Sequence, residues 1–113
     1  MQNVYILWHE YIIHFPKIHR YSLGAKIDTL LIDIIGDVSL AYFTEKKQKL
    51  LYVQRAIRNN DTLKILLGIS NKISALDDKK YFAILEKIIE IGKMLGGWNN
   101  QLISQQEKEN SRN

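Results

Sequence analysis

Apolar side chains recur every three or four residues through almost the whole of this chain, and little in the sequence would interrupt a helix. There is one proline, Pro16, and there are six glycines among 113 residues. A β-rich fold with many tight turns needs more of both. The sequence therefore predicts an all-α protein, and its length suits one domain.

The periodicity divides the chain into four helical segments. The first ends before Pro16, because the residue preceding a proline is pushed out of the helical region. The second begins at the candidate N-cap Ser22 and ends near Phe43. The third covers about residues 45–73 and the fourth about residues 78–95. We expect an antiparallel four-helix bundle with a short first helix over residues 1–104, followed by a polar, disordered tail over residues 105–113.

The helix stripes also predict the core. In the third segment Asn60 falls among apolar residues, where it either fixes the register of the helices or marks a local break. The residues of the fourth segment expected to face inward are Phe82, Leu85, Ile88, Ile89 and Leu95. The short first helix leaves part of a neighbour's apolar face exposed, which favours oligomerisation.

The fourth segment closes with the run EIGKMLGGW, Glu90 to Trp98. Glycine is the poorest helix former after proline, and it supplies the left-handed residue just past many helix ends. Gly96 and Gly97 therefore predict the end of the fourth helix.

Composition excludes several classes of protein. The chain has no cysteine, so it has no disulfides, thiolate metal sites or cysteine nucleophile. The N-terminal run MQNVYILWHEYIIHF lacks the basic leader of a signal peptide, and no apolar stretch is long enough to span a bilayer. We expect a cytoplasmic protein.

No catalytic constellation stands out. The run HEYIIH suggests a zinc protease, but its histidines, His9 and His14, are five residues apart instead of four and do not share a helix face. Asp28 and Asp33 do not share a face either, and Gly96–Gly97 follows a helix, whereas phosphate-binding loops precede one. The sequence predicts a protein that is not an enzyme and has no cofactor or metal.

Charge is segregated along the chain. The formal net charge is +4, yet residues 45–73 carry seven basic and two acidic residues, and residues 22–43 carry one basic and three acidic residues. Lys47, Arg58 and Lys72 share the helix face opposite the core stripe, with Arg55 to one side. Such a face can neutralise phosphates of a nucleic acid. Alternatively, the two helices neutralise each other, within one chain or between subunits.

Three stretches together resemble a known family: the connector FPKIHRYSLGAKI, the basic third segment and the ending EIGKMLGGW. They are similar to the accessory variability determinant proteins of diversity-generating retroelements, which belong to a wider group with the intervening-sequence proteins of ribosomal RNA genes. The resemblance implies a four-helix bundle that forms a homopentameric barrel. It also implies a non-catalytic protein that binds a reverse transcriptase and nucleic acid, as template RNA or cDNA, to support mutagenic reverse transcription.

The resemblance assigns roles to individual residues. Trp98 would cover the end of the bundle near Trp8 or Phe15. The structural signature comprises Phe15, Pro16, Tyr21, Gly24, Gly96, Gly97 and Trp98. The residues expected to contact nucleic acid or a partner are Lys17, Arg20, Lys47, Arg55, Arg58, Lys64 and Lys72. The alternative functions are an intervening-sequence-type protein that binds RNA without a reverse transcriptase, and a structural oligomer whose charges serve subunit contacts.

Overall fold

The computed structural model describes residues 2–111, and these residues form helices and short turns without any strand. The elements in chain order are α1 (Gln2–Ile12), α2 (Lys17–His19), the π-helical turn η1 (Arg20–Gly24), α3 (Ala25–Phe43), α4 (Lys46–Lys72) and α5 (Asp78–Ser111). The all-α prediction is confirmed.

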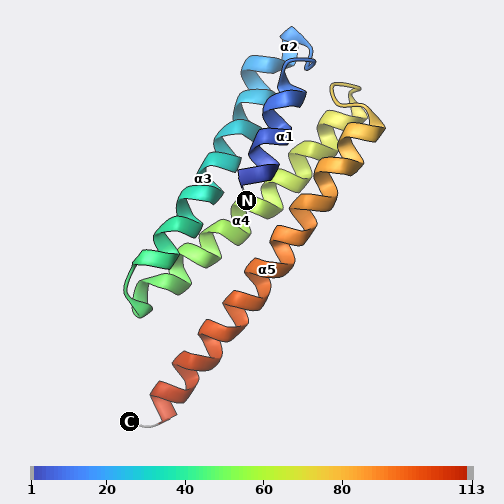
Figure 1. Ribbon diagram of the computed structural model, residues 1–113. Coiled ribbons are helices and arrows are strands. Elements are labelled where there is room, and N and C mark those ends of the chain that lie inside the picture. Colours follow the sequence, from blue (N-terminus) through green and yellow to red (C-terminus); the bar gives the residue numbers. More distant parts are fainter. Residues whose placement is uncertain (1, 112–113) are drawn as a thin grey trace.

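The three long helices lie side by side, with α4 in contact with both α3 and α5. Short turns join α3 to α4 and α4 to α5, so that neighbouring helices run antiparallel (Figure 1). The short α1 packs on α3 and α5 and covers the gap between them over only part of their length (Figure 1). The molecule is thus a four-helix bundle at one end, as the sequence predicts, and a three-helix bundle at the other.

The connector between α1 and α3 is more helical than expected. Pro16 has a non-helical ψ of 137°, and helix resumes immediately after it. Ser22 lies inside η1 and is not an N-cap, because its hydroxyl donates to the carbonyl of His19 at 3.4 Å. Gly24 is buried, and a methyl group there would lie 2.8 Å from Cδ1 of Ile12. Glycine at this position therefore allows α1 to approach the turn closely.

The prediction that α5 ends at Gly96–Gly97 is wrong. The helix continues through both glycines to Ser111, and none of the glycines has a positive φ. Two helical glycines cost about 1 kcal/mol each relative to alanine, but buried Leu95 and Leu102 hold the helix on either side of them. Residues 105–111, expected to be disordered, continue the same helix, and residues 112–113 lie outside the described residues.

The inward stripe of α5 also differs from the expected one. Its buried residues are Ile84, Ile88, Ile91, Leu95 and Leu102. Phe82, with 62% of its surface exposed, and Ile89 do not face the core. The two are seven residues apart and therefore share a helix face, and that face points away from α4. Ile88 and Leu95 are buried, as predicted.

Asn60 is buried and joins α4 to α5. Its Nδ2 donates to the carbonyl oxygen of Ile88 at 3.2 Å, and α4 is unbroken at this position. A methyl group at Gly92 would lie only 3.1 Å from that Nδ2 atom, so glycine leaves the amide room to reach α5. Of the two interpretations of Asn60, the structure favours the one in which it fixes the register of the helices.

Trp98 does not lie where we expected. Because α5 continues, the side chain stays on the helix and contacts Tyr42 of α3, with ring centroids 5.1 Å apart. Trp8 and Phe15 are both buried and contact each other edge to face at 5.7 Å. The two aromatic pairs thus occupy different parts of the bundle.

The structure predicts different responses to alanine at two glycines one turn apart in α5. Gly96→Ala meets no atom within 4 Å, so we expect the free energy of unfolding to rise by up to about 1 kcal/mol. Gly92→Ala crowds the Asn60 amide, which should offset that gain. Thermal unfolding followed by circular dichroism measures both. A lower Tm for Gly96→Ala would show that α5 is not regular helix there.

A hydrogen bond between α1 and α3 makes stability depend on pH. Tyr5 Oη donates to Asp28 Oδ1 at 2.9 Å. This bond, with some burial and the negative charge of Asp28, raises the pKa of Tyr5 above its usual 10.0. Above pH 10 the unfolded tyrosine ionises while the folded one keeps its proton, so stability should fall as pH rises. Between pH 9 and pH 11, we expect the Tm of Tyr5→Phe to decrease by less than the Tm of the wild type. Equal decreases in Tm would contradict this.

Candidate nucleic-acid interface

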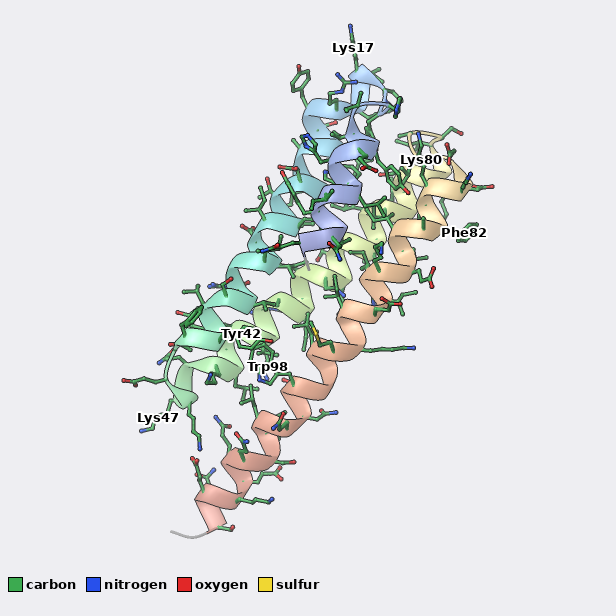
Figure 2. The ribbon with its side chains drawn as sticks, viewed as in Figure 1. Lys17, Tyr42, Lys47, Lys80, Phe82 and Trp98 are labelled. Carbon is green, nitrogen blue, oxygen red and sulfur yellow. The ribbon has the colours of Figure 1, made fainter. Side chains whose placement is uncertain are left out.

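The seven basic residues predicted to contact a partner do not form one patch. Lys17 lies at the α2 end of the bundle, and Lys47 lies at the opposite end, near the α3–α4 turn (Figure 2). The others are distributed between these ends, mostly along α4. Their contacts within the chain show which of these residues stabilise the fold and which are available to a partner.

Arg55 makes an ion pair inside the chain. Its Nε donates to Oδ1 of Asp37 at 2.9 Å, and its Nη2 donates to the same oxygen. Asp37 is 4% exposed, and the hydrogen bond and charge of Asp37 raise the pKa of Arg55 above its usual value. The guanidinium also lies over the ring of Tyr52, 5.2 Å from its centroid. Part of the charge segregation between α3 and α4 is therefore neutralised within one chain.

Arg20 fixes the connector. Its Nη2 donates to the carbonyl oxygens of Ile13 and Phe15, each at 3.0 Å. These carbonyls follow the last residues of α1, where the helix no longer supplies donors. Arg20 therefore acts as a C-terminal cap for α1, and its charge is turned toward the backbone of the connector.

Lys64 is only partly available. Its Nζ lies 3.6 Å from Oδ1 of Asp61, one turn earlier in α4. The same ammonium would be 3.6 Å from a methyl group at Gly92, so the side chain extends toward α5. Lys64 thus contributes more to the α4–α5 contact than to an outer basic surface.

Lys47, Arg58 and Lys72 are exposed and have no ion-pair partner within residues 2–111. At 1.5 Å per residue, they lie about 16 Å and 21 Å apart along α4. Exposed Ile65 and Ile69 lie between the last two. The outer surface of α4 is therefore a sparse basic ridge, on which a few cations are separated by apolar side chains.

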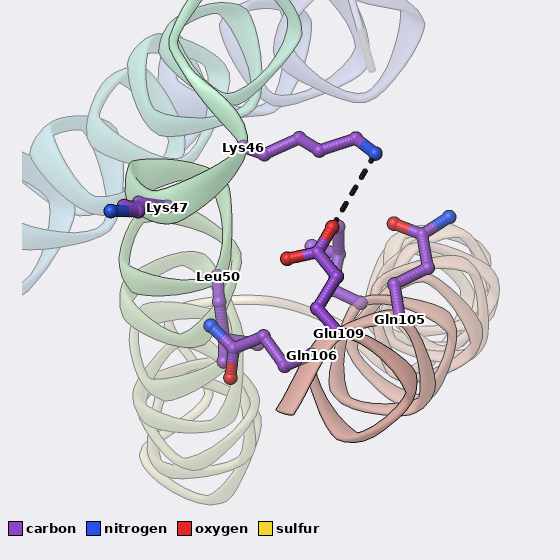
Figure 3. A pocket seen from close by; sticks show the side chains of 7 residues that line it. Lys46, Lys47, Leu50, Gln105, Gln106 and Glu109 are labelled. Atoms are coloured by element: carbon purple, nitrogen blue, oxygen red, sulfur yellow. Dashed lines mark ion pairs between the residues drawn. The ribbon is translucent and has the colours of Figure 1, made fainter. Parts of the chain in front are cut away.

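The start of α4 lies beside the last turns of α5. Lys46 Nζ is 3.7 Å from Oε1 of Glu109, and Gln105 and Gln106 line the small pocket between the helices together with Lys47 (Figure 3). Both partners of the ion pair are mostly exposed, and such a pair stabilises little. Its consequence is local: it neutralises one of the three lysines at the start of α4.

A group of residues between α3 and α5 was not predicted from the sequence. An open groove there is lined by Tyr42, Lys49, Lys93, Met94, Gly97, Trp98 and Gln101. Figure 2 shows the two labelled aromatic residues, Tyr42 and Trp98, close together at the three-helix end. The helical spacing of Met94, Trp98 and Gln101 would have revealed this face, but only if α5 had been predicted to continue past Gly97.

Within residues 2–111, no group of three histidine, aspartate or glutamate side chains is arranged to hold a metal ion. None of the helices described is both long enough and apolar enough to cross a membrane. His9 and His14, the motif considered above, are exposed on α1 and in the turn that follows it.

A family model described as bAvd-like matches residues 1–102. The chain belongs to the bAvd-like family. The resemblance inferred from the connector and the LGGW run is therefore confirmed, and it supports an Avd-type, accessory and non-catalytic role at the level of the family. The match ends at Leu102, the last buried residue of α5, so it covers the whole packed bundle. No curated protein and no solved structure matches the chain.

Charge reversal at two neighbouring arginines of this bAvd-like chain should show which of them stabilises the fold and which only contributes charge to the surface. Arg55→Glu places a carboxylate beside the buried Asp37, so we expect Tm to fall by at least about 5 °C. Arg58→Glu makes the same charge change at an exposed position without an ion pair, and Tm should stay within about 2 °C of the wild type. Calorimetry of the two variants measures this difference. Equal Tm values would contradict a structural role for Arg55.

Proposed function

We propose that this chain is a non-catalytic accessory subunit of a diversity-generating retroelement. It binds the reverse transcriptase and nucleic acid, as template RNA or cDNA, in the cytoplasm and supports mutagenic reverse transcription. The observation that carries this proposal is the bAvd-like family match, which extends from the first residue to the last buried position of α5. In this role the chemistry belongs to the enzyme, and the bundle supplies surfaces.

Self-association is part of the proposal. Two different surfaces of the chain expose large apolar side chains: Ile32 and Leu40 on α3, and Phe82 and Ile89 on α5. When two unlike surfaces of one chain bind each other, the contact repeats from copy to copy, and it closes into a ring when the rotation between copies allows it. The resemblance supplies the number of copies, so the proposed assembly is a homopentamer.

The proposed contacts to nucleic acid are to phosphates, through three residues on α4: Lys47, Arg58 and Lys72. Lys17 lies at the far end of the bundle (Figure 2) and is not counted among these three. Phosphate contacts hold a nucleic acid without reading its sequence. Three neutralised phosphates on a single strand predict that the logarithm of affinity falls with the logarithm of salt concentration with a slope near −2. Arg20, Arg55 and Lys64 are left out of this set because they make contacts within the chain.

The salt dependence can be tested with two variants of equal net charge. Lys47→Gln/Lys72→Gln removes two of the three proposed contacts, and the slope should become shallower, about −0.7. Lys79→Gln/Lys87→Gln removes the same charge from exposed positions of α5 and should leave the slope near −2. Fluorescence anisotropy with a labelled single-stranded RNA at several salt concentrations gives all three slopes. Identical slopes for the two variants would contradict the assignment to α4.

The role itself is tested by capturing the tagged full-length protein from its native host. Mass spectrometry identifies bound proteins, and sequencing identifies bound RNA. Recovery of a reverse transcriptase together with one discrete noncoding RNA is the expected result. Recovery of ribosomal RNA without a reverse transcriptase would overturn the proposal in favour of an intervening-sequence-type protein, and recovery of the chain alone would favour a structural oligomer.

A further inference from the structure

The gap between α3 and α5 is open at the three-helix end of the bundle. The N-terminal end of α1 lies about halfway along the bundle, so α1 covers only the upper part of this gap (Figure 1). Beyond it, Tyr42 of α3 and Trp98 of α5 contact each other across the gap, at a centroid distance of 5.1 Å and an interplanar angle of 40°. Trp98 is half-buried, whereas Tyr42 is 64% exposed. The ring of Tyr42 is thus exposed to solvent and is supported by its contact with Trp98.

Cations border this aromatic pair. Lys49 and Lys93 line the groove on its two sides, from α4 and α5, and no carboxylate lines it. Lys49 Nζ donates to the carbonyl oxygens of Ala41, at 2.9 Å, and Tyr42, at 3.4 Å, so its charge is fixed next to the aromatic residue. Lys93 is exposed and has no ion pair among the residues the structure describes. The groove therefore favours a ligand that is flat, apolar on its faces and negatively charged at its edges.

Gly97 belongs to the same groove. It is exposed, lies inside a helix and has no atom within 4 Å of the position that a side chain would occupy. Neither a turn nor a close contact within this chain requires glycine here. Its effect is to keep the floor of the groove beside Trp98 open.

We propose that the Tyr42–Trp98 groove binds an unpaired base of a single-stranded nucleic acid. The base stacks on the exposed face of Tyr42, and Lys49 and Lys93 attract the phosphates on either side of it. Single-strand binding proteins combine these two elements, an aromatic platform and flanking cations. This proposal rests on the proposed nucleic-acid function and deepens it, because it adds a contact that distinguishes single strands from duplexes, whose bases are already stacked on each other.

Charge complementarity favours this occupant over an apolar helix. An apolar helix seated in the groove would cover the aromatic rings but would also remove the solvent around the Lys93 ammonium without providing an acceptor for it. A nucleotide covers the ring with its base and supplies phosphate oxygens to the ammonium groups. The groove thus differs from the α4 ridge, which offers cations without an aromatic surface.

The test uses the full-length protein and a short labelled oligouridine, with an abasic oligomer of the same length as the probe for phosphate contacts alone. We expect wild-type protein to bind oligouridine about 10-fold more tightly than the abasic oligomer. Tyr42→Leu should lose that difference and keep its affinity for the abasic probe. Tyr21→Leu is the matched control, because Tyr21 is 86% exposed in η1 at the opposite end of the bundle, and it should bind both probes as the wild type does.

A second measurement does not depend on any substitution. The chain has two tryptophans, and Trp8 is fully buried, so quenching of wild-type fluorescence by oligouridine but not by the abasic oligomer reports a base near Trp98. Equal affinities for the two probes, with no quenching, would overturn the stacking site and leave phosphate binding intact. Failure to bind either probe would overturn the nucleic-acid function as well. A change in solution mass for Tyr42→Leu with unchanged affinities would assign the groove to subunit contacts and overturn the proposal.

Discussion

The burial of Trp8 and Phe15 in the core shared with the long helices holds the short first helix on the bundle, and much of the structure depends on it. Both side chains are buried and meet edge to face, a geometry that adds to the burial of apolar surface. Gly24 allows close approach on one side, and Arg20 binds the carbonyls at the end of α1 on the other. These contacts fix α1 at one end of the molecule and leave the other end open, where the aromatic groove forms.

The sequence was sufficient for the architecture because helix periodicity depends mainly on which residues are apolar. The place of Asn60 among the buried residues of α4 was predicted correctly. The end of α5 could not be assigned in the same way. Local propensity argues for a break at Gly96–Gly97, but burial of Leu95 and Leu102 on a continuous stripe favours continuation. Helix propensity is only a weak guide, because tertiary packing can override it. Tertiary packing cannot be inferred from a short run of residues alone.

The candidate site shows a second limit of sequence reasoning. A helical wheel places Arg55 to one side of the basic face that carries Arg58, but it contains no information about the neighbouring helix. In the bundle Arg55 meets the buried Asp37, and Arg58 meets solvent. Identical charges three residues apart therefore have different roles. The aromatic groove was missed for a related reason: Tyr42 and Trp98 are 56 positions apart in the sequence, and only the fold brings their rings together.

The hydrogen bond from Asn60 to Ile88 also has a mechanical consequence. If α5 slid along α4 by one helical turn, the carbonyl of Ile88 would move about 5.4 Å, and the space that Gly92 leaves for the Asn60 amide would move with it. The two longest helices are therefore locked in the axial direction at one point near their middle. This contact resists sliding of one helix of the hairpin along the other, so the relative height of the two helices is set where Asn60 meets α5.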